Sequence, residues 1–222
     1  MCGRYALHSR PEVIALAFGL SEAPATLVPR FNIAPAAEVL IVRRETGGAP
    51  RPALVRWGLL PRWAKDPKRA AKLNNARGET VAEKPSFRDA YRRRRCLVPA
   101  NGFYEWKRVE SRKQPYYVYP AQGELFAFAG LWERWEGASG PLETCAIVTT
   151  QANAPMQAIH DRMPVILAPR DYARWLDCSA DAEVTDLLVP CRAEVIRVHA
   201  VSTAVNRASN DVRELIEPLE QA

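Results

Sequence analysis

The feature that most constrains the fold of this chain is a succession of short segments rich in β-branched and aromatic residues. Proline, glycine or polar clusters bound them, and many of the 18 prolines stand at their ends. Such segments are typical of short strands, and prolines at strand ends favour irregular connections over regular βαβ crossovers. We therefore expect a mainly antiparallel, curved or barrel-like sheet. The expected strands cover residues 39–43, 52–58, 95–99, 103–107, 116–119, 125–131, 144–150, 164–167 and 194–199.

Helices are expected in fewer places and at shorter lengths. The run Ser9-Arg10-Pro11-Glu12 has the spacing of a capping box and predicts a short helix that Gly19 ends. A second helix is expected from Ser86 toward the arginine run at 92–95, and others at 170–177, 180–188 and 210–216. The fold class is therefore α+β, with several short peripheral helices around the sheet. We expect one domain over residues 1–222, since chains of this length commonly remain single.

Composition and charge narrow the class of protein. Hydrophobic residues make up 48% and charged residues 25%, as in ordinary globular chains. No apolar run is long enough to span a membrane, and the N-terminus lacks a signal-peptide layout, so we expect a cytoplasmic protein. The net charge of +6 favours a polyanionic partner.

The cysteines indicate neither disulfides nor a zinc site. They are odd in number and widely spaced, without a C-x-x-C pair, and we expect no metal and no cofactor. Cys96 and Cys145 lie in apolar runs, which is typical of small core residues.

The second residue carries the strongest chemical signal. Removal of Met1 would leave Cys2 with a free α-amine and a thiol on adjacent carbons. Their ordinary pKa values, about 7.7–8.0 and about 8.5, make both nucleophiles partly available near neutral pH. An aldehyde could condense with the amine to an imine, which the thiol would then close to a thiazolidine. The alternative is that a cysteine stands at position 2 without such a role.

Further polar motifs, each with glycine or proline punctuation, accompany the Cys2-Gly3-Arg4 start. They are R-F-N-I-A-P at 30–35, W-G-L-L-P-R-W at 57–63, N-N-A-R-G-E-T at 74–80, N-G-F-Y-E-W at 101–106 and I-H-D-R-M-P at 159–164. In this order they resemble the SRAP family, the SOS-response-associated peptidases, over nearly the whole chain. The resemblance implies a covalent sensor of abasic sites in single-stranded DNA, acting through a thiazolidine crosslink. Autoproteolytic, cysteine peptidase-like activity and lyase activity are further expectations.

The resemblance also implies roles for the motif residues. Cys2 would be the nucleophile, Asn75 the amide that holds the reacting sugar, Glu105 the carboxylate beside the α-amine and His160 an acid/base near the sugar hydroxyl. Each has a structural alternative. Glu105 could lie on a solvent-facing side of its strand, His160 could be a surface turn residue, and Asn75 could bond its local backbone, with Asn74 as a competing position.

Contacts with DNA are expected to combine arginines on phosphates with wedges on bases. We expect Arg4, Arg77 and Arg162 to bind phosphates, and Trp63 and Pro35 to stack on or wedge between bases, although Trp63 could equally be a core residue. The remaining expected DNA contact is Asn32. The arginines at 92–95 are interpreted as a solvated helix end.

The expected partner is single-stranded DNA that contains an abasic site. We expect the protein to be monomeric and, when it is bound to DNA, to be associated with the nucleoid.

Two other functions remain open. Glutamine amidotransferases with an N-terminal nucleophile also begin Met-Cys-Gly and use an Asn-Gly pair in an oxyanion hole, which Asn101-Gly102 resembles. A non-covalent single-stranded DNA-binding module would need the same basic surface, with Cys2 incidental. A glutaminase assay tests the first, and resistance of the DNA complex to boiling in detergent tests the second.

Overall fold

The computed structural model describes residues 2–25, 27–45, 47–66, 73–137, 140–179 and 183–219. Within these ranges the strands form two sheets, one of five strands and one of eight. The first sheet has the order β13 (Ile196–Ala200), β8 (Arg112–Pro120), β7 (Gly102–Val109), β1 (Arg4–Leu7) and β2 (Arg30–Ile33). All of its neighbouring strands are antiparallel.

The second sheet closes on itself. Its strands are β11 (Arg162–Pro164), β10 (Gly140–Gln151), β4 (Pro50–Trp57), β3 (Glu38–Arg44), β6 (Arg95–Ala100), β9 (Phe126–Gly137) and β12 (Ile166–Leu167), with β5 (Asn75–Arg77) paired to β10. Because β10 pairs with both β4 and β9, the strands β10, β4, β3, β6 and β9 form a ring. The contacts of β10 with β4 and β5 are parallel, and the other pairs are antiparallel. The expected α+β, mainly antiparallel and barrel-like fold is confirmed.

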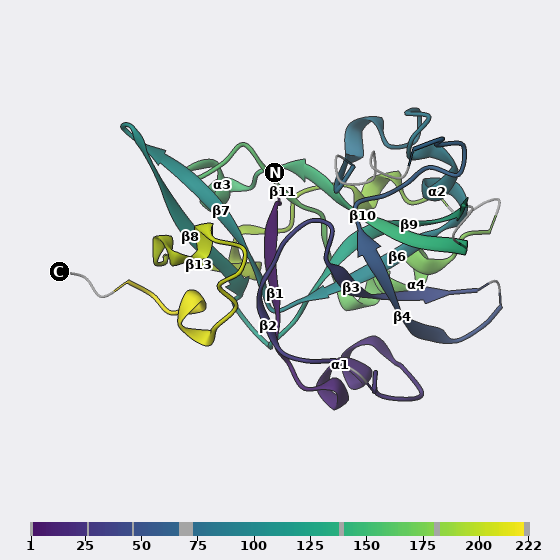
Figure 1. Ribbon diagram of the computed structural model, residues 1–222, viewed down its shortest axis with the longest axis horizontal. Coiled ribbons are helices and arrows are strands. Elements are labelled where there is room, and N and C mark those ends of the chain that lie inside the picture. The colour runs from purple at the N-terminus through teal and green to yellow at the C-terminus, as the bar shows by residue number, and fades with distance from the viewer. Residues whose placement is uncertain are drawn as a thin grey trace.

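The helices are short and lie around the sheets (Figure 1). They are α1 (Pro11–Phe18), α2 (Arg88–Arg93), α3 (Ala154–Gln157) and α4 (Tyr172–Leu176). The capping box expected for α1 does not form, because the N-cap is Arg10 and the Ser9 hydroxyl bonds the Glu124 carboxylate instead. The expected end is correct, since Gly19 takes the left-handed conformation with φ 61°.

Three other helix predictions need correction. The helix expected from Ser86 begins at Arg88. Of the segment 180–188, residues 180–182 lie outside the described ranges, and the rest holds only the 3₁₀ turn η4 (Thr185–Leu187). The segment 210–216 forms the 3₁₀ turn η7 (Arg213–Ile216).

The arginine run at 92–95 is only in part a solvated helix end. Arg92 and Arg93 are exposed, whereas Arg94 pairs with Glu133. Arg95 is 3% exposed, and its guanidinium donates to the carbonyls of Tyr91, Trp175 and Asp177. The Arg95 side chain therefore points inward, and it ties α2 and α4 to β6, the barrel strand that Arg95 begins.

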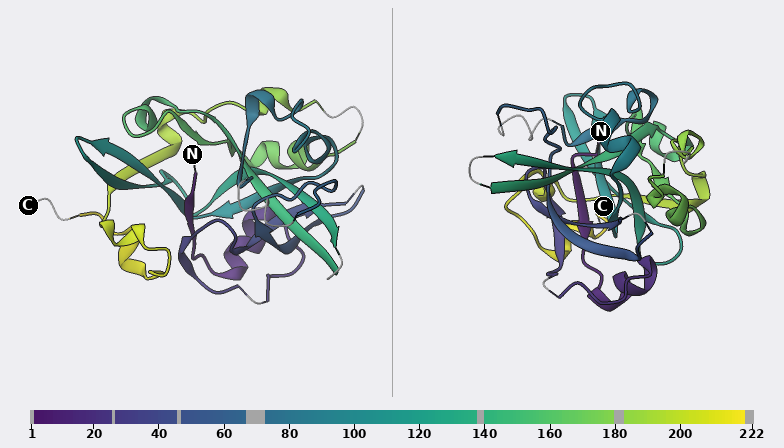
Figure 2. Two further views of the ribbon diagram at one scale, coloured as in Figure 1. Left: turned by 45° about the horizontal axis from the view of Figure 1, so that its top comes forward. Right: turned by 90° about the vertical axis from the view of Figure 1, so that its right-hand side faces the viewer.

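The five-stranded sheet buries both of its faces. Tyr5 and Phe103 belong to the main core, in which Cys96 and Cys145 are buried as expected. Ala6 and Tyr104, which alternate with them, pack on the other face against Val201, Val205 and Leu215. We call residues 202–216, which follow β13, the C-terminal strap. Figure 2 shows this segment, in yellow, against one side of the sheet. None of the described helices is long and apolar enough to cross a membrane.

Candidate active site

Cys2 lies two residues before β1 and is fully buried, with 0% of its surface exposed. Its carbonyl oxygen accepts a hydrogen bond of 2.7 Å from Nδ2 of Asn75. The pKa of the Cys2 thiol is raised above its ordinary value, first by burial and then by the nearby carboxylate of Glu105. The thiol is therefore protonated near neutral pH, and its use as a nucleophile requires a group that takes its proton.

Glu105 reaches Cys2 because β7 runs antiparallel to β1. Arg4 is opposite Tyr104, so Glu105 lies one residue beyond the last pair, beside the start of β1. Glu105 is 3% exposed, which makes the solvent-facing alternative wrong. The alternation along β7 instead sends Tyr104 to the face covered by the C-terminal strap.

Asn75 comes from the second sheet. It begins β5, which runs parallel to β10 and pairs Asn75 with Ile147 and Arg77 with Thr149. The alternative position, Asn74, uses its backbone carbonyl to accept from Ile147 and from the indole of Trp57. Oδ1 of Asn75 is buried and has no hydrogen-bond partner among the described residues. The amide that holds Cys2 therefore keeps one acceptor for another ligand.

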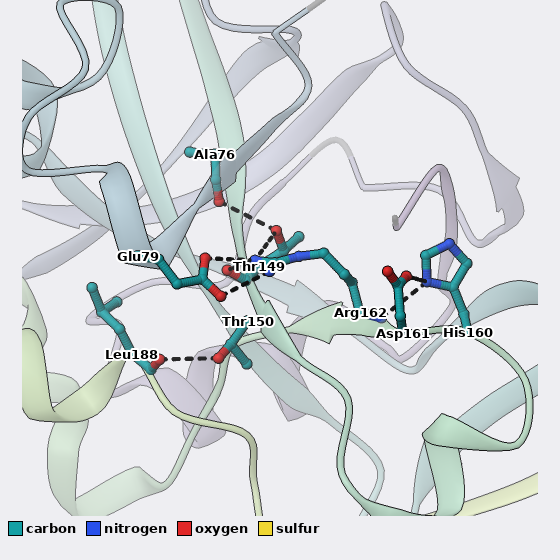
Figure 3. Close-up of polar contacts among 8 residues, drawn as sticks. All are labelled: Ala76, Glu79, Thr149, Thr150, His160, Asp161, Arg162 and Leu188. Atoms are coloured by element: carbon teal, nitrogen blue, oxygen red, sulfur yellow. Dashed lines mark hydrogen bonds and ion pairs between the residues drawn. The ribbon is translucent and has the colours of Figure 1, made fainter.

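His160 lies two residues before β11, which pairs with the other edge of β10. Its Nδ1 accepts from the backbone N–H of Arg162 at 3.0 Å and lies 2.8 Å from Oδ1 of Asp161 (Figure 3). A neutral ring that accepts at Nδ1 carries its proton on Nε2, whereas a protonated ring can donate from Nδ1 to Asp161. The ring therefore has a neighbour suited to each protonation state.

Arg162 is held by Glu79 rather than free. Its two terminal nitrogens donate to the two carboxylate oxygens of Glu79 at 2.7 and 2.9 Å, and one of them also donates to the carbonyl of Thr149 at 2.7 Å (Figure 3). This ion pair lowers the pKa of Glu79, mainly through the hydrogen bonds from Arg162. Arg77, on the same strand face as Asn75, is exposed and forms no ion pair within the described part of the chain.

Two of the expected DNA contacts have structural partners. Asn32 is 1% exposed; its Nδ2 donates to carbonyls of the C-terminal strap at Val205, Arg207 and Asn210, and its Oδ1 accepts from Arg4. Arg4 itself donates to the carbonyls of Val205 and Asn206. These side chains fasten the C-terminal strap to β1 and β2, and we no longer expect Asn32 to contact DNA.

The expected wedge residues are accessible. Trp63 is 56% exposed, so it is not a core residue, although its indole lies 3.4 Å from the carbonyl of Pro85. Pro35 is half-buried and lies two residues after the end of β2. Their contact with bases stays a prediction.

Sequence reasoning gave no role to Glu79, Thr149 or Asp161. The first and last lie inside quoted motifs, and a charge-pairing argument between Glu79 and Arg162 needs the sheet pairing, which is not visible in the sequence. Asn101, in contrast, is occupied: its Oδ1 accepts from the backbone N–H groups of His8 and Ser9, and its Nδ2 donates to Ser9 and to the Glu124 carbonyl. It is not available as an oxyanion-hole donor, which disfavours the amidotransferase alternative.

This geometry defines a protein that buries the cysteine at position 2 beside a carboxylate, at the meeting of two sheets. A family model described as SOS response associated peptidase (SRAP) matches residues 1–208. The chain belongs to the SRAP family.

The similar proteins include both curated relatives and solved structures. The abasic site processing protein YoqW of Bacillus subtilis (strain 168) is 42% identical over 223 residues, covering 98% of this chain and 99% of the relative. The abasic site processing protein HMCES of Xenopus tropicalis is 37% identical over 186 residues, covering 73% of this chain and 56% of the relative. A crystal structure from Bacteroides thetaiotaomicron superposes with a TM-score of 0.85 at 26% identity, covering 98% and 99% of the two chains. One from Bordetella bronchiseptica gives 0.78 at 27% identity, covering 90% of this chain and all of the other.

Proposed function

We propose that this protein processes abasic sites in single-stranded DNA by forming a thiazolidine crosslink through Cys2 after Met1 has been removed. The observation that carries the proposal is the burial of the Cys2 thiol beside the Glu105 carboxylate, with Asn75 bonded to the Cys2 carbonyl. Relatives that match nearly the whole chain are named abasic site processing proteins, which supports the same substrate.

The chemistry proceeds in three steps: a hydrolysis, a condensation that releases one water molecule, and an intramolecular addition that closes the ring. Water first hydrolyses the Met1–Cys2 peptide bond, which frees the α-amine. The amine then attacks the aldehyde of the ring-opened abasic sugar, and loss of one water molecule gives an imine. Finally the Cys2 sulfur adds to the imine carbon, its proton passes to the nitrogen, and a five-membered thiazolidine results.

The neighbouring side chains supply the proton transfers and the hydrogen bond that these steps need. The raised pKa of the thiol calls for a proton acceptor, and the buried Glu105 carboxylate, whose charge acts on this thiol, is the candidate. The unsatisfied Oδ1 of Asn75 offers an acceptor to a sugar hydroxyl. His160 has a partner for either protonation state. It is therefore suited to donate a proton to the hydroxyl that leaves as water and to take up a proton again afterwards. Release of Met1 by the protein itself, and lyase activity, belong to the same proposal, with Glu105 as the candidate base.

The test is incubation of the purified protein with a single-stranded oligonucleotide bearing one abasic site, followed by denaturing electrophoresis and intact-mass measurement. We expect an adduct that survives boiling in detergent, on a protein that starts at Cys2, with a mass corresponding to loss of one water molecule. Cys2→Ala retains an α-amine if Met1 is removed, and should yield an adduct only when borohydride reduces the imine.

The control is the same oligonucleotide with an intact base, which should give no adduct. Crosslinking that persists at the native rate in Cys2→Ala without borohydride would contradict the mechanism. Binding without any adduct would leave the non-covalent DNA-binding alternative.

A further inference from the structure

Strands β7 and β8 continue past Glu105 and leave the body of the protein as a two-stranded projection (Figures 1 and 2). We call residues 107–113, at its outer end, the basic arm. Four of these seven residues are cations and one, Glu110, is an acid: the cations are Lys107, Arg108, Arg112 and Lys113. The strands pair Arg108 with Lys113 and Val109 with Arg112, so the outer end is closed by a two-residue turn.

The charge of the basic arm is not compensated by the protein. Within the described ranges, none of its four cationic side chains forms an ion pair or donates a hydrogen bond, and Lys107 alone of the four is half-buried while the others are exposed. Arg108 lies directly opposite Lys113, and like charges in that position destabilise a strand pair. A bound anion would relieve this repulsion.

One face of the basic arm is continuous with the active site. Side chains alternate along a strand, so Lys107 lies on the same face as Glu105, about 7 Å further along β7. Arg112, the diagonal cross-strand neighbour of Lys107, is on that face as well. The other face carries Arg108 and Lys113 and is the face on which Trp106 donates to Oδ1 of Asn206 in the C-terminal strap.

We propose that the basic arm binds the phosphate backbone of the DNA strand on one flank of the abasic nucleotide, through Lys107 and Arg112. This rests on the proposed function, since it places the reacting sugar at Cys2. A DNA strand that leaves this site in an extended conformation would place its phosphates along the face of β7 that Glu105 and Lys107 share. A membrane surface fits less well, because interfacial binding needs apolar side chains to insert and Val109 is the single exposed large hydrophobic residue of the basic arm as described.

The experiment measures how the affinity for DNA depends on salt. The probes are single-stranded oligonucleotides with a tetrahydrofuran abasic analogue, which has no aldehyde and cannot crosslink. The first oligonucleotide carries the analogue at its 3′ end, so that all other nucleotides lie on the 5′ side of the analogue. The second carries the analogue at its 5′ end, so that all other nucleotides lie on its 3′ side. The third is short and has no flanking nucleotides that could reach the basic arm. The protein variants are K107Q/R112Q and, as the matched control on the opposite face, R108Q/K113Q. Each is first checked for native circular dichroism and melting temperature.

For a single strand each phosphate contact contributes about 0.7 to the slope of log K against log salt. For one of the two flanked oligonucleotides, we expect the K107Q/R112Q substitutions to reduce the slope of log K against log salt by about 1.4, two phosphate contacts, relative to their effect with the short oligonucleotide. For the oligonucleotide with the flank on the other side, we expect no such reduction. The control R108Q/K113Q should lose less than half as much.

Three outcomes would overturn the proposal: unchanged slopes with both flanks, equal losses with both flanks, or equal losses in the two double variants. Binding to vesicles that contain phosphatidylserine, abolished by K107Q/R112Q while DNA binding is unaffected, would assign the arm to a membrane instead. Covalent trapping is scored separately, as adduct formation by the native protein with a short oligonucleotide bearing an authentic abasic site. Its failure would remove the proposed function and leave the salt slopes as a separate result.

Discussion

At the scale of single residues, the site depends on side chains whose chemistry the local sequence does not reveal. Position 2 can be identified from its aminothiol potential alone, but the burial of its thiol beside Glu105 arises from the pairing of β1 with β7. Asn32 shows the reverse: it lies in a motif, yet its amide is consumed by three carbonyls of the C-terminal strap. A motif position therefore identifies an important residue more readily than it distinguishes ligand contact from structural support.

The raised pKa of the Cys2 thiol makes a prediction about pH and alkylation. A raised pKa means a smaller thiolate fraction at a given pH, so in protein that retains Met1 the reaction of Cys2 with iodoacetamide should stay slow from pH 7 to 9. Burial of the thiol acts in the same direction. Processing places an ammonium group on Cys2 itself, and this cation should lower the thiol pKa and speed the reaction.

The measurement is peptide mapping by mass spectrometry over a pH series, on the processed and unprocessed forms. The partly exposed Cys178 serves as the internal control and should be alkylated at least about ten times faster than Cys2 in the unprocessed form. Equal rates for Cys2 and Cys178 in that form would show that the thiol is neither shielded nor shifted in pKa.

At the scale of elements, the strands with strong β-branched or aromatic content can be predicted, whereas β1, β2 and β5 were not. These strands have only three or four residues, and Cys2 and Asn75 are placed by two of them. So short a segment has too few positions to show an alternation, and it becomes a strand because a longer neighbour offers backbone partners. The same holds at the C-terminus, where an expected helix is a single 3₁₀ turn packed through Leu215.

The pairing of β5 and β11 with β10 leads to a prediction about Arg77 and Arg162, two of the three candidate phosphate-binding arginines. The charge of Arg162 is already balanced by Glu79, whereas Arg77 is exposed without an ion pair in the described residues. Arg77→Ala should therefore lower the slope of log K against log salt by about 0.7 for single-stranded DNA, and Arg162→Ala by less than half of that.

The matched variant is Glu79→Gln, which frees the guanidinium of Arg162 and should steepen the slope by up to about 0.7. Fluorescence anisotropy with an unmodified oligonucleotide at several salt concentrations measures all three. If Arg162→Ala loses as much slope as Arg77→Ala while Glu79→Gln changes nothing, then Glu79 does not neutralise Arg162 in solution.

At the scale of the whole molecule, the candidate site exists only where the two sheets meet. Cys2 precedes β1 and Glu105 belongs to β7 of the five-stranded sheet, whereas Asn75 begins β5 beside β10, and His160, the expected acid/base, precedes β11. The general sheet class follows from the sequence because it depends on local patterns. The meeting of the sheets does not, because it depends on pairings between segments far apart in the chain and on the C-terminal strap that covers one face.

The attachment of the C-terminal strap can be tested at Asp211. Its carboxylate accepts from the backbone N–H groups of Phe31 and Asn32 and pairs with Arg30. Asp211→Ala leaves these donors of β2 without their partner, and we expect the free energy of unfolding in urea to fall by about 2–4 kcal/mol, since each unsatisfied donor costs about 1–3 kcal/mol and some are reached by water. Glu214→Ala, an exposed acid of the same segment, is the control and should change it by less than about 0.5 kcal/mol.

The same variants show whether the site and the fold are one cooperative unit. Arg4 joins the C-terminal strap to β1 only two residues after Cys2, so loss of the strap should disturb the site and the sheet together. We expect adduct formation and the far-ultraviolet circular dichroism signal to be lost over the same urea range, and Asp211→Ala to shift both midpoints equally. If crosslinking disappears at lower urea than the dichroism signal, the strap positions Cys2 through a local equilibrium; if Asp211→Ala shifts neither midpoint, its hydrogen bonds to β2 contribute nothing to the fold.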